Sequence, residues 1–153
     1  MTEAGKRIGY VDYVLENFHS NVYLKAFRDD LKSRGFDVTG CTALKEQEGR
    51  QWAEKNQVPY FADPEELNEH VDCYIVLAPG NPETHMELCR MVFPFGKTTY
   101  VDKTFAPDLE TAKQIFALAD ENGVAMQTTS ALRYTAVQEY VVKAGRDKVR
   151  HMV

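Results

Sequence analysis

The chain has 153 residues, of which 44% are hydrophobic and 27% charged, and its formal net charge is −5 at pH 7. This length suits one ordinary domain with a sizeable core, and the composition is typical of a soluble globular protein. The acidic balance argues against a dedicated nucleic-acid binder. No window approaches the length of a membrane span, and the first residues lack the apolar core of a signal peptide. We therefore expect a cytoplasmic protein that binds neither nucleic acid nor membrane.

Segments with strand and helix character alternate along the chain. In chain order we predict a strand at residues 6–13, a helix at 22–31, a strand at 36–42, a helix at 46–55, a short helix at 63–67, a strand at 71–78, a helix at 86–93, a strand at 98–101, a helix at 109–119, a strand at 124–129 and a helix at 137–144. This alternation predicts βαβ units and a doubly wound parallel sheet of about six strands.

Two helices have clear apolar faces, and the chain ends on a strand-like segment. We expect the helix at 109–119 to bury Leu109, Ala112, Ile115, Phe116 and Ala119, and the last helix to bury Val137, Tyr140, Val141 and Ala144. Residues 149–153 either begin a further domain or form a short edge strand that finishes the same sheet.

The three cysteines predict no special chemistry. Cys41, Cys73 and Cys89 show no Cys-x-x-Cys spacing, and the last two lie on apolar segments as small core residues do. We therefore expect no metal site and no thiol catalysis, and the odd number of cysteines indicates a reducing compartment.

The turn after the first strand lacks the glycines of a dinucleotide-binding unit. Such a unit carries Gly-x-Gly-x-x-Gly there, because glycines permit a tight turn and let the backbone approach a pyrophosphate. Here no glycine occurs between Gly9 and Gly35, and the turn carries Asp12, Tyr13 and Glu16. Two carboxylates beside a pyrophosphate would repel it. Gly9, Asp12 and Tyr13 are the residues expected at this position, but they argue against an ordinary dinucleotide grip.

The second strand ends without the acidic residue that would bind a ribose 2′-hydroxyl. Thr42, Lys45 and Arg50 could instead meet a 2′-phosphate, which would favour NADP over NAD, or they could form an unoccupied helix start.

A further candidate loop follows the most apolar strand. Ala78, Pro79 and Asn81 precede a helix whose first N–H groups could contact a ribose or a phosphate. His85 either lines this loop or packs beneath it as a hydrogen-bonded structural histidine, which is the commoner fate of a lone histidine.

The strand at 98–101 is followed by Asp102 and Lys103. In open α/β sheets, ligands bind in the crevice outside the carboxyl ends of the strands. A lysine there can act as a hydrogen-bond donor, an anion anchor or a general acid. The alternative interpretation is a charged turn residue on the surface.

Taken in order, these segments resemble the N-terminal domain of the Gfo/Idh/MocA family of oxidoreductases. The resemblance covers essentially the whole chain, and it is carried by residues 81–85 (Asn-Pro-Glu-Thr-His), 96–104 (Gly-Lys-Thr-Thr-Tyr-Val-Asp-Lys-Thr), 109–113 (Leu-Glu-Thr-Ala-Lys) and 130–134 (Ser-Ala-Leu-Arg-Tyr). It implies a Rossmann-like dinucleotide-binding domain at residues 1–145, followed at 146–153 by the start of a missing C-terminal domain.

The resemblance also implies an activity. Family members transfer hydride between NAD or NADP and a sugar, a polyol or a related small hydroxy or carbonyl compound, and they form homo-oligomers through the C-terminal domain. Lys103 matches the family's lysine that contacts substrate or the nicotinamide ribose and assists proton transfer. Asp102 matches the glutamate that precedes it. Because the other proton-transfer residues belong to the missing domain, we expect this chain alone to be inactive.

Three departures from the family pattern leave two hypotheses open. Asp102 replaces a glutamate, the glycine motif is eroded, and Thr104 replaces a proline, so that we expect a trans peptide bond there. One hypothesis is an NAD(P)-dependent oxidoreductase, which Lys103 supports. The other is a non-catalytic ligand-binding or regulatory module that has lost dinucleotide binding, which the first turn supports. We favour the enzyme.

Overall fold

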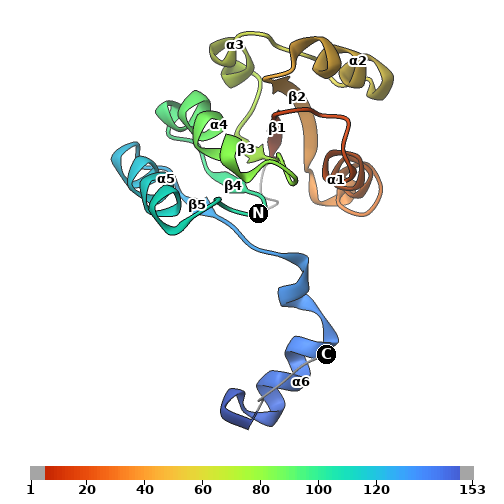
Figure 1. Cartoon of the computed structure of the whole chain (residues 1–153). Coiled ribbons are helices and arrows are strands. Elements are labelled where there is room, and N and C mark those ends of the chain that lie inside the picture. The colour runs from red at the N-terminus through yellow and green to blue at the C-terminus, as the bar shows by residue number, and fades with distance from the viewer. Residues whose placement is uncertain (1–5, 149–153) are drawn as a thin grey trace, which may run out of the picture.

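The computed structural model of the chain describes residues 6–148. Five parallel strands form one sheet in the order β2-β1-β3-β4-β5 (Figure 1). They are β1 (Arg7–Asp12), β2 (Asp37–Ala43), β3 (Cys73–Val76), β4 (Thr99–Val101) and β5 (Met126–Gln127). The predicted doubly wound parallel sheet is thus confirmed, with five strands in the described part of the chain rather than about six. The strand-like segment 149–153 lies outside the described residues.

The strand order reverses direction between β1 and β3. β2 pairs with one side of β1 and β3 with the other, so that Tyr10 lies opposite both Cys41 and Ile75. The connections that leave the carboxyl ends of β1 and β3 therefore run to opposite sides and leave a crevice between the two strand ends. In open α/β sheets, this switch point is the place where ligands bind.

Within the described residues, six α-helices and several short 3₁₀ turns lie between the strands or, in the case of α6 and the last two turns, follow β5. The helices are α1 (Phe18–Arg28), α2 (Glu46–Asn56), α3 (Pro64–Glu69), α4 (His85–Val92), α5 (Leu109–Glu121) and α6 (Ala136–Ala144), and the 3₁₀ turns are Lys32–Arg34, Pro82–Thr84, Phe93–Phe95, Ala131–Tyr134 and Arg146–Lys148. No helix within residues 6–148 is both long and apolar enough to cross a membrane.

The two faces of the sheet carry separate buried clusters, because successive strand residues point to opposite faces. Tyr10 of β1 packs in one cluster with Leu24 of α1 and Trp52 of α2. Val11, the next residue of β1, belongs to the other cluster, which includes residues of α3, α4 and α5. The sheet is therefore covered on both faces, with α1 and α2 on one side and α3 to α5 on the other.

The buried stripe of α5 differs from the expected one. Ile115 and Ala119 are buried as predicted, but Leu109 is 71% exposed and Phe116 50% exposed. The stripe runs through Ile115, Leu118 and Ala119, which are three and four residues apart, and Phe116 lies about 100° further round the helix. The ring of Phe116 instead lies near Phe105, with 5.2 Å between the ring centroids.

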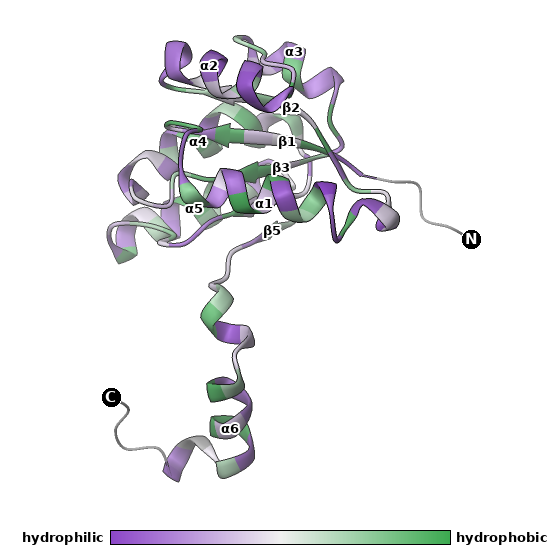
Figure 2. Ribbon diagram, turned by 90° about the vertical axis from the view of Figure 1, so that its right-hand side faces the viewer, coloured by the Kyte–Doolittle hydropathy of each residue, from purple (hydrophilic) through white to green (hydrophobic). Residues whose placement is uncertain are grey.

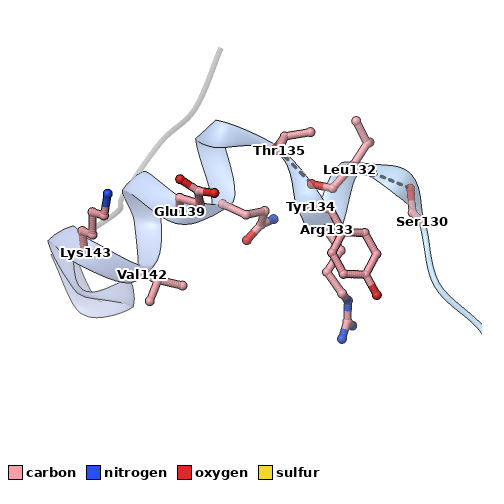
Figure 3. A pocket seen from close by; sticks show the side chains of 9 residues that line it. Ser130, Leu132, Arg133, Tyr134, Thr135, Glu139, Val142 and Lys143 are labelled. Atoms are coloured by element: carbon pink, nitrogen blue, oxygen red, sulfur yellow. Dashed lines mark hydrogen bonds between the residues drawn. The ribbon is translucent and has the colours of Figure 1, made fainter. Parts of the chain in front are cut away.

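The segment from residue 130 to 148 projects away from the sheet (Figures 1 and 2). α6 forms at the predicted place, but it contains no buried residue, and Tyr140 is 71% exposed. The expectation that Val137, Tyr140, Val141 and Ala144 pack as an inner face is therefore wrong for this structure. The concavity in Figure 3 is lined only by residues 130–143, so it belongs to the projecting segment and not to the sheet.

Candidate functional site

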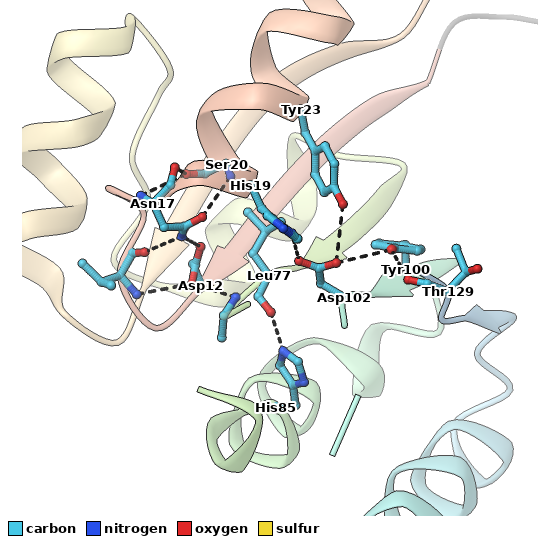
Figure 4. Close-up of polar contacts among 12 residues, drawn as sticks. Asp12, Asn17, His19, Ser20, Tyr23, Leu77, His85, Tyr100, Asp102 and Thr129 are labelled. Carbon is cyan, nitrogen blue, oxygen red and sulfur yellow. Dashed lines mark hydrogen bonds and ion pairs between the residues drawn. The ribbon is translucent and has the colours of Figure 1, made fainter. Parts of the chain in front are cut away.

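Asp12, the last residue of β1, bridges the crevice at the switch point. Its side chain is fully buried, and its Oδ1 accepts hydrogen bonds from the amide N–H of Ala78 at 2.9 Å and of Val14 at 3.3 Å. Its Oδ2 accepts a third hydrogen bond from Asn17 Nδ2 at 2.8 Å (Figure 4). Because Ala78 follows β3, this carboxylate spans the gap between the ends of the two strands.

The environment of Asp12 shifts its titration. Burial raises the pKa of the Asp12 carboxyl to about 6, and the hydrogen bonds from Asn17 and from nearby backbone amides limit this rise. The raised pKa follows from desolvation, because the donors that contact the carboxylate are uncharged amides.

The first turn of α1 is satisfied by the chain's own side chains. The side chain of Asn17, the N-cap residue, accepts from the amide of Ser20 at 3.0 Å, and Ser20 Oγ in turn lies 3.4 Å from the amide nitrogen of Asn17. This reciprocal capping box occupies an N–H group that a helix start offers to an anion. Asn17 and Ser20 thus cap the start of α1, and Asn17 also donates a hydrogen bond to Asp12.

A second polar cluster surrounds Asp102, just after β4. The Asp102 carboxylate is fully buried and contacts His19 Nδ1 of α1. The hydroxyl groups of Tyr23 and Tyr100 lie 3.5 and 3.4 Å from Asp102 Oδ1, and Tyr100 donates a shorter hydrogen bond, 2.9 Å, to the carbonyl oxygen of Thr129 (Figure 4). Burial, followed by the negative charge of Asp102, raises the pKa of the Tyr23 hydroxyl.

Sequence reasoning missed His19, Tyr23 and Tyr100. His19 and Tyr23 are four residues apart on α1, so they share one face of that helix. Tyr100 and Asp102 are two residues apart and lie on one side of the strand. These spacings were available from the sequence. Only the packing of α1 against the sheet, however, brings His19 and Tyr23 to Asp102.

Lys103 follows Asp102 at the carboxyl end of β4, as predicted. Its side chain is half-buried. Within residues 6–148, its ammonium group makes no ion pair and no side-chain hydrogen bond. The Lys103–Thr104 peptide bond is cis. The expectation of a trans bond, which rested on the general preference of non-proline residues, is therefore wrong.

Gly9 lies away from the crevice, in the interior of β1. A Cβ atom at this position would meet the ring of Tyr74 at 3.0 Å and Val71 at 3.1 Å. The glycine is thus explained by the close approach of these side chains to the strand, and the structure places it away from the ligand position expected for it.

Two basic side chains follow β2, and each contacts another side chain of this protein. Thr42 is buried within the strand, whereas Lys45 is exposed and its ammonium lies 5.5 Å from the ring centroid of Tyr13. Arg50 forms an ion pair with Glu46, with 2.8 Å between Nη2 and Oε1. Lys45 and Arg50 are therefore both exposed, and of these two candidate partners for a 2′-phosphate Lys45 is the one without an ion pair among the described residues.

The loop after β3 is held by its own backbone. The amide of Asn81 donates to the carbonyl oxygen of Ala78 at 3.0 Å, and Ala78 has a positive φ of 56°. Pro79 is half-buried between them. His85 is fully buried beneath this loop, where Nδ1 lies 2.9 Å from the carbonyl oxygen of Phe105 and Nε2 contacts that of Leu77. These contacts suit the structural role for His85.

The chain matches a known family. The family model described as "Oxidoreductase family, NAD-binding Rossmann fold" (GFO_IDH_MocA) matches residues 15–130, which is more than half of the chain. The chain therefore belongs to this family, and the resemblance drawn from its motifs is confirmed. The match begins at Leu15, after the turn in which Asp12 stands in the place of a glycine motif.

Individual relatives support the same assignment. The uncharacterized oxidoreductase YhhX of Escherichia coli (strain K12) is 29% identical over 69 residues, which cover 45% of this chain and 20% of that protein. A putative NADPH-dependent oxidoreductase of Desulfitobacterium hafniense DCB-2 has a TM-score of 0.75 at 19% identity, over 94% of this chain and 40% of that one. The WlbA dehydrogenase of Bordetella pertussis, in complex with NADH and UDP-GlcNAcA, has a TM-score of 0.71 at 17% identity, over 94% and 40%. The chain thus spans less than half the length of these proteins.

The crevice can be tested against the dinucleotide that the family name implies. A diphosphate at the switch point would need the amide groups at the ends of β1 and β3, and Asp12 already accepts hydrogen bonds from two of them. A buried carboxylate with these partners does not fit a glycine-type diphosphate grip. Beside the crevice, the positively charged side chains of Lys45 and Lys103 would not repel a phosphate.

Proposed function

We propose that the full protein is a dehydrogenase that uses NAD or NADP and acts on a sugar, a polyol or a related small hydroxy or carbonyl compound. The observation that carries the proposal is the position of Lys103 at the carboxyl end of β4, in a chain that belongs to an NAD-binding oxidoreductase family. WlbA, which resembles this chain in fold, is described in complex with NADH and a nucleotide sugar. This neighbour supports the sugar class of substrate.

Lys103 supplies the chemistry that this chain itself can offer. An alcohol that is being oxidised must lose its hydroxyl proton, and a carbonyl that is being reduced develops negative charge on oxygen. An ammonium group beside that oxygen donates a hydrogen bond and balances the charge. Asp102 contacts His19, and Lys103 has no ion-pair partner within residues 6–148, so its charge is available for this role.

Titration of the 153-residue chain with NAD⁺, NADH, NADP⁺ and NADPH by calorimetry tests the proposal. We expect at least one dinucleotide to bind at millimolar concentration or below. We expect Lys103→Ala to weaken that binding about tenfold, which corresponds to about 1.4 kcal/mol. Lys113→Ala removes an exposed lysine of α5 and serves as the matched control. Absence of saturable binding of all four dinucleotides would count against the proposal.

The second candidate is a non-catalytic module that binds a different ligand or regulates a partner. The bridge from Asp12 to Ala78 favours it, because this contact occupies the crevice that a dinucleotide would cross. The same titration separates the two candidates, since the second requires no affinity for any of the four dinucleotides.

A further inference from the structure

The end of β1 carries the carboxylate of Asp12. In this class of fold, the same position normally binds the negatively charged phosphates of a ligand. Asp12 is the last residue of β1, and Ala78 follows β3, the neighbouring strand across the switch point. The 2.9 Å hydrogen bond between Asp12 Oδ1 and the amide of Ala78 joins the two sides of the crevice. The Asp12 side chain is fully buried, so it lies inside the crevice and not on its surface.

The donors around Asp12 are of the type that bind phosphate. Backbone N–H groups and side-chain amides at such strand and helix ends hold the diphosphate of a dinucleotide in this class of fold. Here the amides of Ala78 and Val14 and the side chain of Asn17 all donate to the Asp12 carboxylate. Asn17 also caps α1, so its position is fixed from both sides.

We infer that Asp12 is a built-in anion at the switch point. Its carboxylate occupies the hydrogen-bond donors that would otherwise bind the diphosphate of a ligand, so the crevice selects against ligands that carry a diphosphate. This inference concerns the crevice that the proposed function would use, but it does not depend on that function. It adds a residue that determines which ligands enter. A dinucleotide that binds here must displace the Asp12 side chain or lie beside it, where the two negative charges repel.

A comparison of ADP with adenosine isolates the diphosphate. Both compounds carry the same base and ribose, and only ADP brings the diphosphate to the crevice. Calorimetric titration of each into the wild-type chain and into Asp12→Gly measures the ratio of the two affinities. We expect Asp12→Gly to raise the affinity for ADP by about tenfold or more and to leave that for adenosine unchanged.

Two further variants make the test specific. Asp12→Ser keeps a hydroxyl that can accept from the amide of Ala78, so it retains part of the bridge if the glycine variant fails to fold. Glu16→Gln removes another carboxylate of the same turn, one that contacts Lys55 and Asn21 instead of the crevice amides. We expect Asp12→Ser to behave like Asp12→Gly, and Glu16→Gln to behave like the wild type.

The amide resonance of Ala78 provides a second readout. In the wild type it should not move when ADP is added, whereas in Asp12→Gly it should shift, because a phosphate oxygen then replaces the carboxylate. An ADP affinity that is the same in the wild type and both Asp12 variants, or an equal rise for adenosine, would overturn the inference, and so would failure of every variant to bind ADP.

The outcomes separate this inference from the proposed function. If the wild type binds no dinucleotide while the Asp12 variants gain ADP binding, the inference holds and the NAD(P)-linked function fails. If the wild type binds a dinucleotide and removal of Asp12 leaves the ADP affinity unchanged, the inference alone fails.

Discussion

Two buried carboxylates, at the ends of β1 and β4 on either side of β3, have different surroundings. Asp12 receives hydrogen bonds from uncharged amides, whereas Asp102 contacts His19 and lies near two tyrosine hydroxyls. A buried carboxylate is costly unless it is hydrogen-bonded, and both are. The difference is that the partners of Asp12 belong to the loops that border the crevice, while those of Asp102 connect α1 to the strand that presents Lys103.

The raised pKa of Asp12 predicts a pH dependence of stability. Its carboxyl has a pKa of about 6 in the folded chain and an ordinary value near 3.8 when unfolded. The folded state therefore holds its proton to higher pH than the unfolded state. The stability that this group contributes is fully present below about pH 4 and is lost as pH rises through about 6, by up to about 3 kcal/mol.

Urea denaturation of the wild type and of Asp12→Ser between pH 4 and 7.5 measures this contribution. Other acids, such as Asp72 beside Arg7, have lowered pKa values and act in the opposite direction, so the difference between the two proteins is the informative quantity. We expect the advantage of the wild type over Asp12→Ser to shrink with increasing pH. A difference that stays constant would contradict the assignment.

At the level of elements, the packing of β2 depends on Gly40. A Cβ atom there would lie 2.6 Å from Leu67 Cδ1 of α3 and 2.8 Å from the ring of Phe61. Gly40→Ala should therefore lower the free energy of unfolding by about 1–3 kcal/mol, because the helix and the ring must move outward.

Gly80→Ala is the matched control for that prediction. Gly80 lies in the exposed loop after β3, and a Cβ atom there would meet nothing within 4 Å. We expect thermal unfolding of this variant to stay close to that of the wild type, or to shift slightly upward through a less flexible unfolded chain. An equal loss of stability in both variants would show that crowding around Gly40 does not cause the loss.

Much of the element pattern could be predicted from local signals. Asp63 and Asp108 cap α3 and α5 as their sequence context indicates, and Gly35 ends the first helical region in the left-handed conformation. The regular alternation also predicts the parallel sheet. The outer position of Phe116 could not be predicted in the same way, because two helical stripes one residue apart look alike until the neighbouring helix is placed.

The candidate site was less accessible to sequence reasoning. Lys103 and Asp102 were found because a short motif marks the end of their strand. The contact of Asp102 with His19 joins residues far apart in the chain and depends on the angle at which α1 crosses the sheet. The erosion of the glycine motif was visible in the sequence, but its consequence, a carboxylate hydrogen-bonded across the crevice, required the geometry of both strand ends.

At the level of the whole molecule, the sheet and its helices form a body that does not depend on the projecting segment. Residues 131–148 contribute no buried side chain among those described. A chain that ends at Ser130 should therefore unfold with a free energy within about 0.5 kcal/mol of the longer chain. Chemical denaturation followed by tryptophan fluorescence, which reports on Trp52 in the buried cluster, measures this directly.

A large loss of stability in the shortened chain would mean that the segment docks on the body in solution. The pocket of about 340 Å³ between α1 and β4, which Tyr23 and Tyr100 line together with Tyr134 of the segment, is the place where such docking would occur. Substitution of Tyr134 by Ser in the longer chain should then reproduce the loss.

Both rims of the described sheet discourage strand addition. Residues 59–61 run along the outer side of β2, where the amide of Cys41 donates to Pro59 and the amide of Phe61 donates to Cys41, both at 2.9 Å. At the opposite rim, β5 has only two residues. Short or covered rims deny a second polypeptide the ladder of free backbone groups on which fibrils and swapped sheets grow. Strand addition at these rims is therefore disfavoured, and an association of this body relies mainly on side-chain contacts.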